Sequence, residues 1–262
     1  MKTFLVIGEE CTDEFVYGKA ERLSPEAPVP VFVPTNVVLN RGMAGNVIEN
    51  LFALQKDKPA IIFESVSNPK ELVKKRFVDE KSNHIFLRVD SGEKVKYPFA
   101  PPFAPDDAFL KMISSADCII ISDYNKGYLT DESFDYIFEK VIEKQVVILD
   151  SKRPLTASIL GFVDFVKLNE QEYENNCKIL GKDVMAHFKD KLIVTIGGNG
   201  TFYNGKVYPV EKRQTIDVSG AGDTFVAAFA YMYMECFDTA KSILFANDMA
   251  SIVVTKRGVS TI

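Results

Sequence analysis

Short apolar runs rich in β-branched residues alternate along this chain with stretches of helical periodicity, and no other feature constrains the fold as much. Apolar runs of about four to eight residues that end in a polar residue or glycine are typical of strands buried on both faces. Strands that alternate with helices predict an α/β fold with a largely parallel sheet covered on both faces. We predict strands at Phe4–Ile7, Ala60–Phe63, Cys118–Ile121, Val146–Leu149, Phe162–Leu168 and Leu192–Ile196, and helices at Asn46–Leu54, Asp106–Ser114, Asp131–Glu143 and Glu170–Leu180.

Two regions interrupt this alternation and predict a second, smaller sheet. Residues 24–39 carry prolines between apolar residues, and strands punctuated by proline belong at sheet edges. Within residues 74–99, two apolar segments flank the turn-forming Ser91-Gly92-Glu93. We expect these two regions to lie together beside the main body of a single domain that spans residues 1–262.

The last quarter of the chain begins with a hairpin signal. Asn204-Gly205 stands between strand-forming residues, which predicts a β-hairpin over Thr201–Tyr208. A glycine-rich turn and two consecutive apolar helices follow, at about 221–236 and 239–256. We expect the chemistry of this protein at the start of the first of these helices.

Charge and cysteine usage argue against several classes of function. A formal net charge of -5 does not suit a protein that neutralises long stretches of nucleic acid. The apolar stretch Thr224–Met234 is shorter than the roughly 20 residues that span a bilayer, so we expect no membrane anchor. Four cysteines without a CxxC pair argue against a structural zinc site and suit a reducing cytosol, so we expect a cytoplasmic protein.

The glycine-rich turn ends in a carboxylate, Asp223, and permits two interpretations. Glycines let the backbone approach a ligand closely, and the unpaired N–H groups at a helix start attract anions. Capping alone could explain Asp223, because the helix dipole stabilises such a carboxylate by about 0.3 to 1 kcal/mol. A phosphoryl-transfer enzyme, however, needs a proton acceptor beside donors for the moving phosphoryl group. Asp223 and the amides of residues 220 to 222 would supply both.

The segment Asp217–Phe225, with the sequence DVSGAGDTF, resembles the C-terminal signature of the PfkB (ribokinase-like) carbohydrate kinases. The resemblance implies a ribokinase-like fold with a small β lid, and a kinase that uses ATP and Mg2+. It also implies that Asp223 is the catalytic base and that Gly220, Ala221 and Gly222 form the anion hole at the γ-phosphate. In the wider family, Asn169 and Glu172 would form an NxxE element linked to Mg2+ and phosphate binding.

The resemblance extends over most of the chain to the D-glycero-β-D-manno-heptose-7-phosphate kinases, first through Glu21–Val31 and then through Ser122–Gly127, Leu149–Lys152, Leu168–Glu172 and Phe245–Asn247, in the order of that subfamily. Carried over residue by residue, it implies binding of the sugar or sugar phosphate by Asp13, Gly42, Asn46 and Lys126. It also implies that Lys152 lies near phosphate groups. A single lysine is otherwise most simply a solvated surface charge.

The same resemblance places the nucleotide between the segment that begins at Thr195 and the last helix. It implies contacts from Thr195, Gly197, Gly200, Asn247 and Gly258. Gly197 and Gly200 would equally suit a tight turn into the hairpin, because glycine serves both purposes.

Three features depart from the heptose-kinase pattern. Met43 stands where these kinases usually have a glycine, so its side chain would reshape the sugar pocket. Glu9 follows Gly8 where aspartate is usual. The segment 54–74 is shorter than in the family, which would remove a strand and a helix.

These observations favour a kinase that moves the γ-phosphoryl group of ATP to a hydroxyl of a sugar or sugar phosphate. In this interpretation, residues 24–39 and 74–99 form a lid that closes on the acceptor. Two alternatives stay open, a nucleoside or other small-alcohol kinase of the same fold and a non-catalytic module that binds sugar or nucleotide. Lid strands rich in Val, Ile and Phe also predict a homodimer through the lid.

Overall fold

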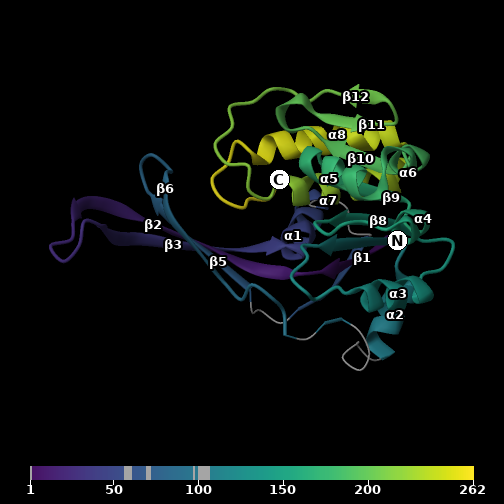
Figure 1. Cartoon of the computed structure of the whole chain (residues 1–262), viewed down its shortest axis with the longest axis horizontal. Coiled ribbons are helices and arrows are strands. Elements are labelled where there is room, and N and C mark those ends of the chain that lie inside the picture. The colour runs from purple at the N-terminus through teal and green to yellow at the C-terminus, as the bar shows by residue number, and fades with distance from the viewer. Residues whose placement is uncertain (1, 56–60, 69–71, 97, 100–106) are drawn as a thin grey trace.

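The computed structural model describes residues 2–55, 61–68, 72–96, 98–99 and 107–262, and two sheets form its framework (Figure 1). The larger sheet has eight strands in this described part of the chain, in the order β12-β11-β10-β9-β8-β7-β1-β4. Six strands run parallel, and the hairpin β11–β12 extends one edge in antiparallel fashion. The strands are β1 (Lys2–Gly8), β4 (Ile61–Ser67), β7 (Cys118–Asp123), β8 (Val146–Ser151), β9 (Phe165–Asn169), β10 (Leu192–Thr195), β11 (Thr201–Tyr203) and β12 (Lys206–Tyr208).

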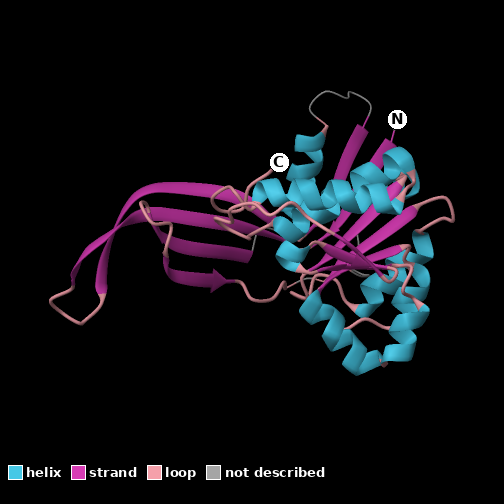
Figure 2. Cartoon of the chain, turned by 90° about the horizontal axis from the view of Figure 1, so that it is seen from above, coloured by secondary structure: helices cyan, strands magenta, loops and turns pink. Residues whose placement is uncertain are grey.

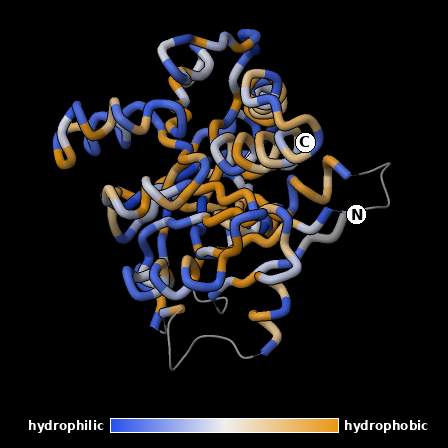
Figure 3. The backbone as a smooth tube through the Cα atoms, turned by 90° about the vertical axis from the view of Figure 1, so that its right-hand side faces the viewer, coloured by the Kyte–Doolittle hydropathy of each residue, from blue (hydrophilic) through white to orange (hydrophobic). Residues whose placement is uncertain are grey.

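Helices cover both faces of this sheet, as Figure 2 shows, which confirms the predicted fold class. Side chains alternate across β1, so that Phe4 and Val6 face one layer while Leu5 and Ile7 face the other. Figure 3 shows the resulting concentration of hydrophobic positions at the centre of the main body. The first layer contains α1 (Ala44–Leu54), α7 (Ala221–Cys236) and α8 (Thr239–Val253), and the second contains α2 (Asp107–Ser115), α3 (Asp131–Lys140), α4 (Ala157–Phe162), α5 (Glu170–Leu180) and α6 (Lys182–His187).

The second sheet has four strands in the order β3-β2-β5-β6 and extends away from the main body (Figures 1 and 2). The predicted small sheet is confirmed, and it contains residues 30–39, 74–79 and 85–91 of the two regions expected for it. The second apolar segment is not a strand, since residues 92–96 after the turn form none. Strand β2 of this sheet was not predicted, because Asp13 interrupts the alternation of buried apolar residues that indicates a half-buried strand. The strands are β2 (Glu10–Leu23), β3 (Pro30–Met43), β5 (Leu72–Asp79) and β6 (Ile85–Ser91).

Other differences from the predicted elements are local. The apolar run from Phe162 was predicted as strand throughout. In the structure, Phe162 is the last residue of α4, a short helix that Thr156 caps at its start, and β9 begins only at Phe165. The hairpin is confirmed, with Asn204 at φ 45° and Gly205 at φ 79°. The short segment 54–74 contains strand β4. Residues 56–60 and 69–71 of this segment lie outside the described residues, so the predicted strand start at Ala60 does too. Asp106, the predicted start of a helix, also lies outside them.

No helix in the described ranges combines the length and the apolar character that crossing a bilayer requires.

Candidate active site

Asp223 lies in the first turn of α7 and is only 3% exposed. The Tyr124 hydroxyl donates to its Oδ1 at 2.6 Å, and the Asn46 amide Nδ2 donates to its Oδ2 at 3.1 Å. Burial raises the pKa of Asp223 to about 6, and the bonds from Tyr124 and Asn46 oppose this rise. A carboxyl group whose pKa approaches neutrality suits a general base.

The turn before Asp223 begins at Gly220, the N-cap of α7, whose φ of 81° favours glycine. Its carbonyl accepts a hydrogen bond from Asn46 at 3.3 Å. The Ala221 N–H donates to the Val218 carbonyl at 3.2 Å and is therefore occupied. Of the three amides expected at the anion, that of Ala221 is thus bonded within the protein. Helix geometry leaves the first-turn amides of Gly222 and Asp223 for an anion.

A buried lysine faces the same turn. Lys167 on β9 lies with its Nζ 3.2 Å from each carboxylate oxygen of Asp150, at the end of β8. A Cβ placed on Gly222 would stand 2.9 Å from this Nζ, so the ammonium group lies against the start of α7. Sequence reasoning missed Lys167, although a lysine inside an apolar strand run is a signal, because a buried charge needs a partner.

The NxxE element caps a helix. The Asn169 Oδ1 accepts from the Glu172 N–H at 2.8 Å, and the Glu172 Oε2 accepts from the Asn169 N–H at 2.7 Å, which forms a capping box at the start of α5. The Glu172 Oε1 lies 2.6 Å from the Nζ of Lys152. Burial lowers the pKa of Lys152, but Asp150 and Glu172 outweigh it, so the net pKa is raised and the ammonium persists.

These contacts limit how Mg2+ would bind. Both oxygens of Glu172 already accept from protein donors, and across the described ranges no three His, Cys, Asp or Glu side chains gather as a metal site. Mg2+ usually keeps several waters and takes further ligands from substrate phosphates. The residues present therefore fit Mg2+ that is held through water and phosphate oxygens, not through direct ligation by Asn169 and Glu172.

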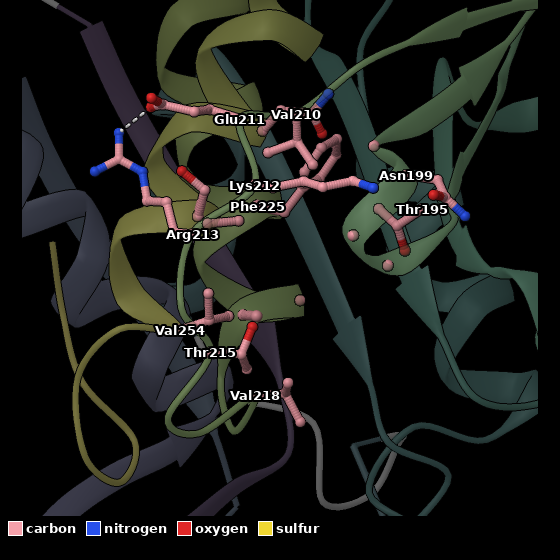
Figure 4. Close-up of a pocket in the computed structure, with 18 residues that line it drawn as sticks. Thr195, Asn199, Val210, Glu211, Lys212, Arg213, Thr215, Val218, Phe225 and Val254 are labelled. Atoms are coloured by element: carbon pink, nitrogen blue, oxygen red, sulfur yellow. Dashed lines mark hydrogen bonds and ion pairs between the residues drawn. The ribbon is translucent and has the colours of Figure 1, made fainter.

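A pocket of about 470 Å³ lies beside this turn, between the β10–β11 connection, residues 210–218 and the helices α7 and α8 (Figure 4). Figure 4 shows Val210, Lys212 and Phe225 towards one end and Val218 towards the other. Apolar walls of this kind fit a nucleobase. Four of the residues expected at the nucleotide line this pocket, namely Thr195, Gly197, Gly200 and Asn247. Ala221 and Gly222, which were expected in the anion hole, line it too.

Two residues expected at the nucleotide make contacts within the protein. The Asn247 amide accepts from Thr201 Oγ1 at 2.6 Å and donates to the Tyr208 carbonyl at 2.9 Å, so it braces the hairpin against α8. Gly258 donates its N–H to Asp217 Oδ2 at 3.2 Å and lies against the Phe15 ring, away from the pocket lining.

The residues expected at the sugar lie outside the lining of this pocket. Asp13 is buried and paired with Arg76, and a Cβ on Gly42 would stand 2.0 Å from its Oδ2, so only glycine fits there. Asn46 is committed to Asp223 and Gly220. Met43, the residue before α1, is buried at φ 60°, and it lines a small pocket of about 50 Å³ with Lys74 and Lys126.

A model of the pfkB family of carbohydrate kinases matches residues 86–262, more than half of the chain. The chain belongs to this family. The resemblance to the PfkB carbohydrate kinases that the sequence carries is therefore confirmed. It is 28% identical over 298 residues to the bifunctional protein HldE of Helicobacter pylori (strain HPAG1), in an alignment that covers 98% of this chain and 64% of the relative. The chain thus spans less than two thirds of that relative's length.

Solved structures share the fold of this pfkB family member. Ribokinase of Arabidopsis thaliana, complexed with ribose and ATP, superposes with a TM-score of 0.70 at 17% identity, covering 98% of this chain and 94% of the other. The nucleoside kinase of Methanocaldococcus jannaschii gives a TM-score of 0.65 at 18% identity, with 99% and 93% covered. Because one fold carries both activities, it does not select the acceptor.

Proposed function

We propose that this pfkB kinase transfers the γ-phosphoryl group of ATP to a hydroxyl of a sugar or sugar phosphate, with Asp223 as the general base. One observation carries the proposal. A buried carboxylate with a pKa of about 6 stands in the first turn of the helix whose start lines the large pocket. A proton acceptor and an anion site then lie side by side, as phosphoryl transfer requires.

In the proposed reaction, Asp223 accepts the proton of the acceptor hydroxyl. The hydroxyl oxygen then forms a bond to the γ-phosphorus while the bond from this phosphorus to the β–γ bridging oxygen breaks, and ADP leaves with that electron pair. The first-turn amides of α7 and the Lys167 ammonium group stabilise the negative charge on the moving phosphoryl group. When Mg2+ is bound, it neutralises charge on the nucleotide phosphates.

The acceptor is proposed to be anionic, with a heptose-phosphate-like molecule as one candidate. Lys74 and Lys126 both line the small pocket on the acceptor side of Asp223, although Asp90 and Glu93 line it too. In this proposal Asp13 does not bind the acceptor directly. It forms an ion pair with Arg76, and this pair holds the side chains that surround the acceptor in place. The second sheet would act as the lid over this acceptor.

A coupled ADP-release screen with Mg2+ tests the proposed function. We expect turnover with at least one of a panel of free sugars, hexose phosphates and heptose phosphates, with the phosphorylated acceptors used best. Turnover confined to nucleosides would select the nucleoside-kinase alternative. Nucleotide binding without turnover on any acceptor would select the non-catalytic module.

A homodimer through the second sheet is also proposed, because one of its faces exposes apolar side chains on both sides of the ion pair between Glu14 and Lys75. Strand register places Val37 and Leu39 of β3 on the same face as Leu87 and Val89 of β6, and their exposed fractions are 51%, 64%, 55% and 41%. The opposite face carries Phe15 and Arg76. An exposed apolar face of this kind is typical of an interaction site, and a second copy would cover it isologously.

We therefore expect the double variant Leu39→Glu/Leu87→Glu to sediment as a monomer at concentrations where the wild type is a dimer, because two charges per subunit would be desolvated in the interface. Sedimentation velocity measures this. Val207→Glu, at a half-exposed position on β12, is the matched control and should leave the dimer intact. A monomeric wild type would contradict the proposal.

The compartment is proposed to be the cytosol, in keeping with four cysteines that all carry free thiols.

A further inference from the structure

Tyr124 contacts the carboxylate that is proposed to act as the base. Its hydroxyl donates to Asp223 Oδ1 at 2.6 Å, although the two residues are 99 positions apart in sequence. Burial raises the pKa of Tyr124 well above its usual value, so the hydroxyl keeps its proton and remains a donor. A carboxylate offers about four lone-pair positions, so the bonds from Tyr124 and Asn46 leave room for an acceptor hydroxyl.

The loop that carries Tyr124 is held by a second buried carboxylate. Glu9, at the end of β1, is fully buried, and its Oε2 accepts from the Tyr124 N–H at 2.7 Å. Its Oε1 accepts from the N–H groups of Lys126 and Tyr128, each at 3.1 Å. Gly127 at φ 89° lets the backbone curl around this carboxylate. Glu9 therefore fixes the backbone from which Tyr124 reaches Asp223.

The Tyr124 ring is fixed from two further elements. The Nζ of Lys74, on lid strand β5, lies 5.2 Å from the ring centroid, and the Nζ of Lys152, after β8, lies 5.5 Å from it. Cations at these distances are attracted to an aromatic ring. Backbone, ring and hydroxyl of Tyr124 are thus all held, as expected of a group that sets the geometry of its neighbour.

We propose that Tyr124, anchored by Glu9, is a positioning residue for phosphoryl transfer, whose hydroxyl orients the Asp223 carboxylate towards the acceptor and favours its ionised form. The inference rests on the proposed role of Asp223 as the base. Tyr124 acts through Asp223 and takes no proton itself.

Several charged groups surround Asp223 and set the sign of the expected pH effect. Burial and the nearby charge of Asp150 raise the pKa of Asp223, whereas Tyr124, Asn46 and Lys167 lower it. Cys11 on β2 and Lys152 also lie within electrostatic reach of Asp223. Removing the Tyr124 hydroxyl deletes one of the lowering contributions, so the pKa of Asp223 should rise further. A base must be ionised to act, so the acid limb of the rate profile should move to higher pH.

The test is Tyr124→Phe, which keeps the ring between the two lysines. We expect kcat at the pH optimum to fall about 10-fold, because the carboxylate loses its orientation. The acid limb of kcat/KM should move up by about one pH unit, and the KM for ATP should stay within about twofold. Tyr136→Phe, in the aromatic cluster around Phe99 and Phe109, is the matched control and should change none of these.

Glu9→Asp is a second variant, because it keeps the charge but shortens the reach to the loop. It should move the acid limb in the same direction as Tyr124→Phe. Wild-type kcat and pH profile in Tyr124→Phe would overturn the inference, as would a fall in kcat with an unmoved acid limb. Failure of the proposed function looks different, because Asp223→Asn would then retain turnover.

Discussion

Asp223→Asn is expected to lower kcat by a factor of about 10² to 10⁴, the usual contribution of a positioned general base. Asparagine has nearly the same shape, and it can accept from the Asn46 amide while its own NH2 group donates to the Tyr124 hydroxyl oxygen. It cannot take the proton of an acceptor hydroxyl. ATP binding should persist, because the pocket walls at Val218 and Phe225 are untouched. Single-turnover kinetics and ATP titration of the purified variant measure both quantities.

The same substitution should not destabilise the protein at neutral pH. The pKa of Asp223 is raised in the folded state to about 6, so folding favours its protonated form. Ionisation therefore costs stability, and this cost appears as the pH rises from the unfolded pKa through the folded pKa. A neutral asparagine removes the cost, so the unfolding midpoint at pH 7 should be unchanged or higher.

Asp131→Asn provides the matched control for this variant. Asp131 also lies in the first turn of a helix, α3, but its side chain is exposed and bridges to Arg153. Loss of that charge should reduce stability by no more than about 1 kcal/mol and leave turnover unchanged. Wild-type turnover in Asp223→Asn would leave only the capping interpretation for Asp223.

Local patterns made much of this site predictable. The GAGD turn, the two apolar helices after it and the Asn204-Gly205 hairpin are written in contiguous residues, and the structure contains each of them. The capping box of Asn169 and Glu172 shows the limit of such patterns. The family resemblance singled out these two residues for Mg2+ and phosphate binding, whereas the structure shows them as the capping box of a helix.

Residues that act across the fold could not be predicted in this way. Tyr124 and Asn46 meet Asp223 across 99 and 177 positions of sequence, and Lys167 meets Gly222 only because β9 ends beside α7. Asn46 was expected at the sugar and not at Asp223, and neither Tyr124 nor Lys167 was given a role of its own. Their roles depend on which strands are neighbours in the sheet, and this order places β1, β7, β8 and β9 side by side.

Gly220→Ala is expected to reduce turnover by about 10² or more, the second-largest effect among these variants. A Cβ at this position would stand 2.6 Å from Asn46 Nδ2 and 3.3 Å from a Val259 methyl group. Asn46 would have to move, and its hydrogen bond to Asp223 would be lost with it. Displacement of a catalytic group by about 1 Å costs about 10²-fold in rate.

In Gly220→Ala, the effect of backbone strain must be distinguished from the effect of the steric clash with Asn46. The variant Gly181→Ala makes this distinction, because it introduces the strain without the clash. Gly181 lies between α5 and α6 at φ 88°, close to the 81° of Gly220, but a Cβ there meets nothing within 4 Å. Both variants should lose about 1 to 2 kcal/mol of unfolding free energy, because an L-residue is strained at positive φ. Only Gly220→Ala should also lose turnover. If the two variants lost stability equally and both kept wild-type kcat, the start of α7 would not be the place where the phosphoryl group is transferred.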